Sequence, residues 1–345
     1  MKRPPVLSRL LAAFALVFVS AIVFADSASA HVKWFCAYNV AGQPVGLEQV
    51  LCPDFEYLVG VSILALMVGA LFERTRFGIY QLNAIARVTY FIDENAELMF
   101  RAGGAFFFIA IWGFGGIILT PELKTNSAVV GAIQLMIAAG LLWRPTMPLS
   151  ALGIVALFLI GIWNYGLFHM ADYPIFLGIA AYIALAGLQR DFFGIKAIDI
   201  VRWSAGITLM WASIEKWAYP EWSFPLFAQH PDLTMGFDPM FFMRAAGAIE
   251  FALAFSLMWT PLVRRVGAIL LLSMFVSAIF QFGKVDMIGH SMIIVVLLAI
   301  AAERREKSEL VRYPWLVPFS YAGALTIFLA TYYVAHSVIY GTSIS

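Results

Sequence analysis

Residues 247–261 read GAIEFALAFSLMWTP, and residues 131–145 read GAIQLMIAAGLLWRP. The two stretches share Gly-Ala-Ile at the start and Trp-x-Pro at the end, at the same spacing. The segments before them also correspond, because Arg101 opens one and Arg202 opens the other. Each of these segments is followed by Pro-Glu near its far end, at Pro121-Glu122 and Pro220-Glu221. Self-similarity of this kind indicates an internal repeat.

The composition is that of a membrane protein. Hydrophobic residues make up 62% of the sequence and charged residues 12%, whereas about a quarter of the residues in a soluble domain are charged. We therefore expect an all-α polytopic membrane protein whose apolar surface faces the lipid bilayer and other helices. The formal net charge is +1, which gives no basis for binding nucleic acid.

Apolar stretches of roughly 17–22 residues predict ten transmembrane helices. The predicted spans are 56–73, 99–119, 127–143, 149–166, 174–188, 199–217, 241–259, 265–283, 287–302 and 317–338. Arginine and lysine gather in alternate connections, which the positive-inside rule assigns to the cytoplasm. This orientation places the mature N- and C-termini in the periplasm and the protein in a bacterial inner (cytoplasmic) membrane.

The repeat predicts two tandem four-helix bundles, over residues 97–190 and 198–303. Both enter the membrane in the same direction, so the duplication is parallel and differs from the inverted repeats of many transporters. A first transmembrane helix and a cytoplasmic linker precede them in residues 56–96. A C-terminal transmembrane helix follows in residues 304–345.

The N-terminus has the features of a secretory signal peptide. A basic region precedes an apolar run over residues 10–25, and Ala28-Ser29-Ala30 supplies the small residues that a signal peptidase accepts. Cleavage would remove residues 1–30 and leave a periplasmic segment, residues 31–55, that begins with His31. The alternative is an uncleaved first helix.

The two cysteines, Cys36 and Cys52, both lie in that periplasmic segment. Export to an oxidising compartment favours a disulfide between them. Closing such a loop contributes about 3 kcal/mol in the chain-entropy model. Two free thiols are the alternative.

All five histidines are predicted to lie at or just inside the periplasmic face. They are His31, His169, His230, His290 and His336. Imidazole binds metal ions and carries protons near neutral pH. The one-sided set predicts a polar site that opens outward, and the alternative is that histidines tolerate interfaces.

Glu250 is the strongest single candidate for this site. It lies in the middle of an apolar span, where an acidic group costs about 2–3 kcal/mol and usually has a function. It should face the bundle interior and have a partner, or be protonated. The alternative role is a structural salt bridge with Lys216 or Arg244.

Glu215 and Lys216 lie where the sixth predicted span leaves the membrane. Adjacent residues of a helix point about 100° apart and do not pair with each other, so each is expected to reach a different neighbour. The alternative is an ordinary interfacial pair with a snorkelling lysine.

Asp286 and His290 lie at the outer entrance of the ninth span, together with Lys284. They are four residues apart and therefore share a helix face. A carboxylate in that position can orient an imidazole and raise its basicity. His169 and Asp172 hold the matching place in the first unit. The alternative for both pairs is helix capping at a wet interface.

Residues 218–240, AYPEWSFPLFAQHPDLTMGFDPM, form the longest outer connection of the second unit. Four prolines and several aromatic residues predict a compact cap on the membrane surface. We expect it to cover a site formed by Glu215, Lys216, Glu250 and His290. The alternative is a stiff connector that binds no ligand.

These residues together resemble the DoxX/DoxD-like superfamily of four-helix membrane proteins. The resemblance rests on the helix opened by Arg202 that ends near Glu215-Lys216, on Gly-x-x-Glu at Gly247 and Glu250, and on the closing Trp-x-Pro. The second unit matches better than the first, which has Phe114-Gly115 and Gln134 at the equivalent places. The resemblance implies a membrane component of a redox or quinone-linked system.

A copper site is a second hypothesis. An N-terminal His31 would offer its α-amine and its ring to one ion, and copper(II) prefers such nitrogen ligands. Thioethers suit copper(I), although methionine is also common filler in apolar helices. The methionines expected near the same face are Met235, Met240, Met243, Met287 and Met292.

Three functions are therefore open at the level of sequence. The protein is a quinone-linked redox component, a handler of copper or another solute, or a non-catalytic scaffold for a periplasmic oxidoreductase subunit. In the redox function, Glu250 and His290 carry protons while quinone docks between helices. The sequence does not decide whether the chain is an enzyme.

Overall fold

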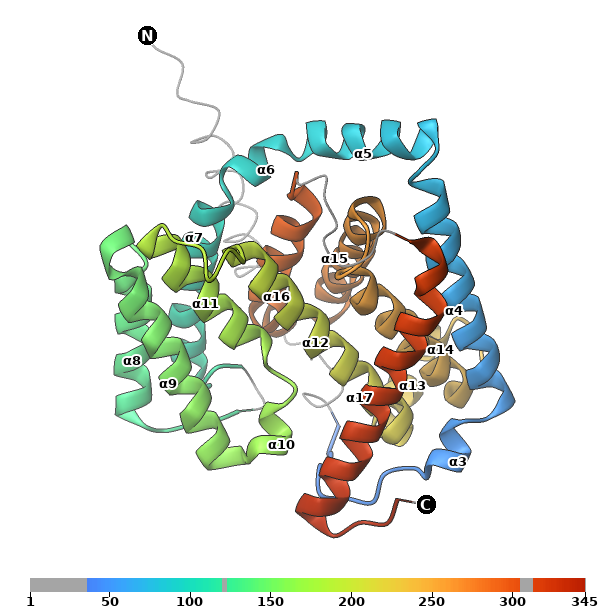
Figure 1. The fold of residues 1–345 in the computed structure, drawn as a ribbon. Helices are drawn as coiled ribbons and strands as arrows, with labels where there is room; N and C mark the ends of the chain where they lie inside the picture. The colour runs from blue at the N-terminus through green and yellow to red at the C-terminus, as the bar shows by residue number, and fades with distance from the viewer. Residues whose placement is uncertain (1–35, 120–122, 305–312, 345) are drawn as a thin grey trace.

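The computed structural model describes residues 36–119, 123–304 and 313–344, apart from the side chain of Gln281. Within these ranges the protein is all-helical (Figure 1), and extended backbone pairs only at two isolated bridges, Gly116 with Lys124 and Phe192 with Ile195. The predicted all-α class is confirmed. The predicted signal peptide, residues 1–30, lies outside the described residues.

The helices follow one another with short connections. In chain order they are α3 (Leu47–Val50), α4 (Pro53–Phe72), α5 (Arg76–Val88), α6 (Tyr90–Glu94), α7 (Ala96–Phe114), α8 (Ala128–Gly140), η1 (Arg144–Thr146), α9 (Met147–Tyr165), α10 (Leu167–Met170), α11 (Ile175–Leu188), α12 (Ala197–Ala218), η2 (Pro220–Ser223), α13 (Phe224–Gln229), η3 (Pro231–Thr234), α14 (Pro239–Ser256), α15 (Pro261–Phe282), α16 (Lys284–Ala302), η4 (Pro314–Leu316) and α17 (Val317–Tyr340).

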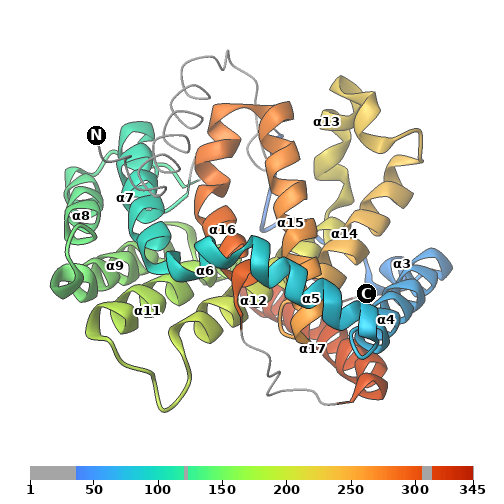
Figure 2. The same ribbon diagram turned by 90° about the horizontal axis from the view of Figure 1, so that it is seen from above.

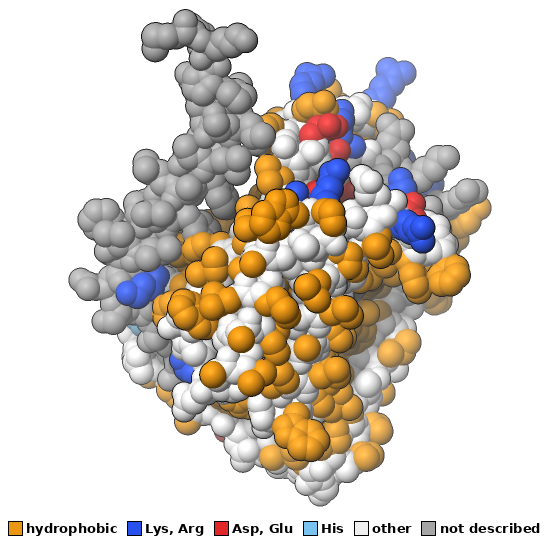
Figure 3. Space-filling model, turned by 90° about the vertical axis from the view of Figure 1, so that its left-hand side faces the viewer, with side chains coloured by type: hydrophobic (Ala, Val, Ile, Leu, Met, Phe, Trp, Pro, Cys, Tyr) orange, Lys and Arg blue, Asp and Glu red, His pale blue; other side chains and the backbone are white. Residues whose placement is uncertain are grey.

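Each of the ten predicted spans overlaps one of these helices, with ends that differ by up to several residues. Six helical stretches in the described part of the chain are long and apolar enough to cross a membrane. They are Pro53–Phe72, Ala96–Phe114, Arg144–Tyr165, Pro261–Phe280, Lys284–Ala302 and Pro314–Tyr340. Helices α8 and α11 are apolar but shorter. Figure 3 shows hydrophobic side chains spread over one side of the molecule, with Lys, Arg, Asp and Glu gathered toward its upper end.

The two predicted units each contain four helices that pack in a ring. In the first, α7 packs against α8, α8 against α9, α9 against α11 and α11 against α7. In the second, the same cycle runs through α12, α14, α15 and α16. Helices α11 and α12 pack together, as do α7 and α16, so the rings share a long boundary. Fully buried Phe107 and Phe251 lie in one contiguous core.

The second and third helices of each ring approach closely at one crossing. A Cβ atom at Gly267 of α15 would lie 1.8 Å from Ser256 Oγ of α14, and one at Gly140 of α8 would lie 2.3 Å from Ser150 Oγ of α9. The glycine and the serine have therefore exchanged helices between the two rings. In both rings a serine hydroxyl donates to the equivalent backbone carbonyl of the second helix. Ser150 Oγ donates to Ile137 O at 2.9 Å, and Ser256 Oγ donates to Leu253 O at 2.6 Å.

The linker after α4 is helical, which the sequence analysis did not predict. Helices α5 and α6 lie across the ends of the other helices (Figures 1 and 2). Thr75 caps α5 by accepting a hydrogen bond from Gly78 N at 3.1 Å. Arg265 donates to Leu82 O at 3.1 Å and holds α5 against the second ring.

The first ring departs from the predicted span 99–119, because α7 ends at Phe114. Gly115 adopts a left-handed conformation, with φ of 68°, that glycine reaches without steric cost. The Gln134 amide then donates to Gly116 O at 2.6 Å and to Ile117 O at 2.9 Å. These contacts satisfy carbonyl groups that a continued helix would have paired internally.

Candidate functional site

A cavity of about 410 Å³ lies inside the second ring, at the end covered by the 218–240 connection. Its walls come from α12, α14, α15 and α16, from the start of α11, and from Leu119, Asp172 and Tyr173 of the first unit. Apolar side chains supply most of the lining. The five residues predicted for the site all line this one cavity: Glu215, Lys216, Glu250, Asp286 and His290.

Lys216 and Glu250 form an ion pair across the cavity. Lys216 Nζ lies 2.7 Å from Glu250 Oε2, and the two side chains are 24% and 20% exposed. The sequence analysis left Lys216 and Arg244 open as partners of Glu250. Arg244 instead pairs with Asp54 of α4, at 3.2 Å. Glu250 therefore pairs with the only lysine that lines the cavity among the described residues.

Asp286 and His290 form a second pair on the first turns of α16. His290 Nδ1 lies 3.0 Å from Asp286 Oδ2, as expected for residues four apart on a helix. Asp286 is 1% exposed, and its Oδ1 atom has no hydrogen-bond partner in the described part of the chain. When Nδ1 donates to an ionised carboxylate, the proton-accepting nitrogen of a neutral imidazole is Nε2.

The outer connection forms a roof, as predicted, and it is helical. Elements η2, α13 and η3 contribute Trp222, Leu226, Phe227 and Leu233 to the lining. Leu226 and Phe227 are buried, at 6% and 8% exposure. The connection is therefore packed against the ring.

The glycine of each Gly-Ala-Ile motif faces a tryptophan of the preceding long helix. A Cβ atom at Gly247 would lie 2.4 Å from the indole nitrogen of Trp217, and one at Gly131 would lie 3.0 Å from the Trp112 ring. Trp217 also donates to Arg244 O at 3.1 Å. The motif therefore sets how closely α12 and α14 pack beside Glu250.

Four of the five histidines lie within the described residues. Each either lines the cavity or contacts an aromatic side chain that lies at or beside the cavity. His290 lines the cavity, and the His230 ring centroid lies 6.4 Å from that of Phe282, which also lines it. Tyr38 connects His169 to the lining residue Trp222, with centroid distances of 5.9 and 5.7 Å.

His336 is fully buried behind the roof. Its Nε2 atom lies 2.7 Å from Tyr219 Oη and 2.7 Å from Val40 O, and its Nδ1 atom lies 2.7 Å from Thr342 Oγ1. The Tyr219 ring stacks on Trp222 at 4.2 Å. His336 therefore joins the segment before α3 and the segment after α17 to the cavity wall, and it does not itself line the cavity.

Several lining residues were not identified from the sequence. They include Thr208, Tyr219 and Trp222. Asp172, which was predicted to belong with His169 to the first unit, also lines this cavity. Thr208 Oγ1 accepts a hydrogen bond from Ile175 N at 2.8 Å, which fastens α11 to α12. Tyr219 and Trp222 carried a local signal, the aromatic-rich outer connection, but no pattern showed which aromatic rings turn inward.

The first ring has a groove whose described lining residues carry no charge. This groove, of about 470 Å³, lies at the same end and contains Gly131, Gln134 and Trp112. Gln134 is buried and bonded to backbone carbonyls, whereas the equivalent Glu250 faces the cavity.

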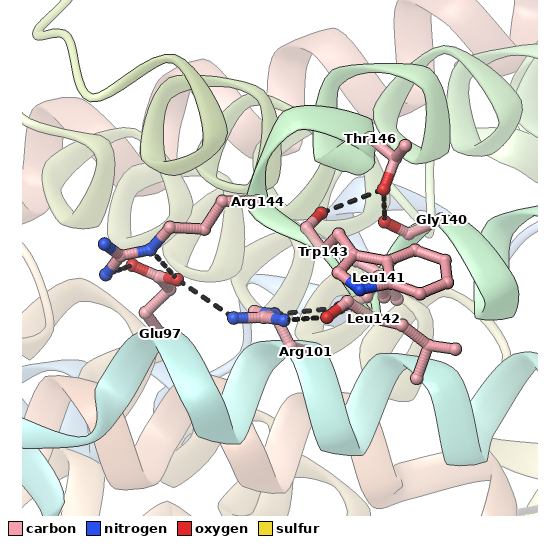
Figure 4. Close-up of polar contacts among 8 residues, drawn as sticks. All are labelled: Glu97, Arg101, Gly140, Leu141, Leu142, Trp143, Arg144 and Thr146. Carbon is pink, nitrogen blue, oxygen red and sulfur yellow. Dashed lines mark hydrogen bonds and ion pairs between the residues drawn. The ribbon is translucent and has the colours of Figure 1, made fainter.

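A network of charged residues lies near the α8–α9 turn (Figure 4). Arg144 donates twice to Glu97, at 2.7 and 2.6 Å, and Arg101 donates to the carbonyls of Leu141 and Leu142. Arg202, the counterpart of Arg101, instead pairs with Asp199 at 2.7 Å and with Glu303 at 3.2 Å. None of these side chains lines the cavity. They hold helix ends together.

The predicted disulfide between Cys36 and Cys52 is not formed, and both cysteines are free thiols. The two residues belong to different local environments. Cys52 is the N-cap of α4, whereas Cys36 lies against the backbone of Leu226 in α13. Burial raises the pKa of the Cys36 thiol above its ordinary value. Nearness in sequence was therefore a poor guide to pairing.

The proposed copper ligand His31 lies outside the described residues. Within the described ranges, no group of three or more His, Cys, Asp or Glu side chains is arranged to hold a metal ion. Of the five predicted methionines, Met243 and Met292 line the cavity. Copper binding stays a prediction.

Comparisons with protein-family models, with curated proteins and with solved structures found no match to this chain. The fold and its six long apolar helices define a helical membrane protein. The geometry of the cavity is therefore the main ground for proposing a function.

Proposed function

We propose that this chain is an inner-membrane protein of ten spans, built from two tandem four-helix bundles, and that the cavity of the second bundle binds a quinone. The function is that of a redox component, with quinone as the substrate. The observation that carries this proposal is one mostly apolar cavity holding two separate polar pairs, Lys216–Glu250 and Asp286–His290.

A quinone head is a flat, neutral ring with a carbonyl oxygen at each end. Ligand sites of this kind are apolar with a few placed polar groups. Lys216 Nζ can donate to one carbonyl, and His290 in its imidazolium form can donate to the other through Nε2. Phe275 lies beside His290, with ring centroids 4.7 Å apart, and offers a face for stacking.

The charge of the lining favours a neutral occupant over an anion. Among the described residues it contains four carboxylates, Asp172, Glu215, Glu250 and Asp286, and one ammonium group, on Lys216. Like charges repel strongly where water is scarce. A small anionic reductant is therefore expected to react elsewhere, on a periplasmic oxidoreductase partner that supplies electrons.

The two pairs fit the handling of protons. Conversion of quinone to quinol takes up two electrons and two protons. Asp286 holds the His290 ring by its Nδ1 atom, so Nε2 can give a proton to one oxygen, or take one back in the reverse direction. Glu250 would pass protons to or from the second oxygen beside Lys216. The partner provides both electrons.

A titration tests this proposal. Protein in lipid nanodiscs is titrated with a short-chain quinone, and quinone reduction by the supplied reductant and partner is followed separately. We expect wild-type protein to bind quinone, Glu250→Gln to lose electron transfer, and His290→Ala to bind at least tenfold more weakly. Asp54→Asn, which removes a carboxylate of an ion pair outside the cavity, is the matched control and should behave as wild type.

Other outcomes favour the other functions. Metal in the purified protein that is lost on His31→Ala would support copper handling. A co-purifying oxidoreductase together with full tolerance of Glu250→Gln and His290→Ala would support a scaffold. Absence of quinone binding by the wild-type protein would refute the proposal.

A further inference from the structure

We infer that the occupant of the cavity enters sideways from the bilayer, between α14 and α15, and so belongs to the class of lipid-soluble molecules with a long apolar tail. This inference rests on the proposed function, because it names the form of quinone that the site accepts. Nothing in the repeat or in its resemblance indicated a route of entry.

Helices α14 and α15 approach closely near the turn that joins them. They are closest where Gly267 meets Ser256, since a Cβ at Gly267 would overlap the serine hydroxyl. From this crossing the two helices run apart (Figure 2), and side chains of both line the cavity beyond it, Phe242 and Ala246 from α14 and Met274 and Phe275 from α15.

The burial pattern of α15 changes along its length. Leu262, Arg264, Ala268 and Leu271 are each at most 3% exposed. After Leu271 no described side chain of α15 is buried. Met274 lines the cavity and is also 37% exposed. Met274 therefore marks the place where the inferred route meets the cavity, on a helix that belongs to a candidate membrane span.

The proposed opening is the side of the cavity between α14 and α15. Buried Leu226 and Phe227 lie at the outer end, and α12, α16 and residues 172–176 line the other sides. The charged groups thus lie on α12, α14 and α16 and at Asp172 just before α11, whereas the cavity residues of α15 are all apolar. A ligand with a polar head and an apolar tail matches this division.

Two quinones that share one head and differ in their tails test the inference. One carries a tail of about ten carbons or more, and the other has no tail. Each is titrated into wild-type protein, Met274→Trp and Ser273→Trp in nanodiscs. Ser273 is the matched control, because it is the exposed neighbour of Met274 on α15 and does not line the cavity.

We expect Met274→Trp to weaken binding of the tailed quinone, or to slow its association, at least tenfold while changing the tail-less compound less than threefold. Ser273→Trp should change neither. Equal loss of both compounds in Met274→Trp, or loss of neither, would overturn the sideways route. If Met274→Trp fails to fold, Met274→Ala takes its place in the test. Met274→Ala widens the gap between α14 and α15, so it should strengthen binding of the tailed quinone, or speed its association, relative to the tail-less one. Failure of wild-type protein to bind either quinone would refute the proposed function itself, which separates the two claims.

Discussion

Gln134 and Glu250 hold equivalent positions in the two halves of the chain, yet they serve different partners. The Gln134 amide donates to Gly116 O and Ile117 O and closes the turn after α7. Glu250 pairs with Lys216 inside a cavity. An amide can satisfy backbone carbonyls, whereas a carboxylate cannot donate to them. The first half thus uses this position for structure, and the second keeps a charge in reach of a ligand.

The largest expected effect comes from making the first half like the second. Gln134→Glu would place a carboxylate against two carbonyl oxygens at a site that is 1% exposed. We expect a loss of about 4 kcal/mol of stability, since two buried acceptors lose their donors and a charge is buried. Thermal unfolding in nanodiscs measures it. Gln134→Leu removes the hydrogen bonds without adding a charge, so it should lower stability by less. Equal losses of stability in the two variants would show that the hydrogen bonds alone matter.

The glycine–serine exchange gives the next largest effect. Gly267→Ser would set two serines against each other at the α14–α15 crossing and should cost about 2–3 kcal/mol through overpacking. The double change Ser256→Gly with Gly267→Ser reproduces the arrangement of Gly140 and Ser150 in the first ring. We expect it to recover most of the loss in the same unfolding assay. A double variant no more stable than the single one would contradict the equivalence of the two crossings.

The comparison also shows what the sequence could predict. All ten predicted stretches are helical, because backbone groups away from water must be paired within the chain. Six of the described helices are long and apolar enough to cross a membrane. The pair Asp286–His290 was predictable because a spacing of four fixes it locally. Glu250–Lys216 was predicted as one of two pairings, and the packing of α12 on α14 decides between them. Helix α5 was missed because Arg76–Val88 is short and mixes polar with apolar residues.

A smaller effect is expected from breaking the pair in the cavity. Lys216→Met would leave Glu250 without its partner and cost about 1–2 kcal/mol, less than a fully buried pair because both side chains are partly exposed. The double variant, Lys216→Met with Glu250→Gln, has the same residue type at this position as the first half has at Gln134. It should regain stability but not quinone turnover. A double-mutant cycle with an interaction energy near zero would show that the pair is not coupled.

The smallest expected effect on stability comes from removing an ion pair on the surface, in contrast to the pair in the cavity. Asp54 is exposed, and its ion pair with Arg244 spans 3.2 Å. Removing it with Asp54→Asn should change stability by less than about 0.5 kcal/mol. The midpoint of thermal unfolding is the measurement. A loss as large as that of Lys216→Met would mean that α4 is held to α14 mainly by this contact.

The most direct test of the central claim maps where a quinone binds. A photoreactive quinone is bound to wild-type protein in nanodiscs, activated by light, and located by mass spectrometry of the labelled peptides. The account predicts labels in residues 208–250 and 271–293, with loss of labelling when an excess of unmodified quinone is added. Competed labels confined to residues 112–135 of the first ring would contradict it.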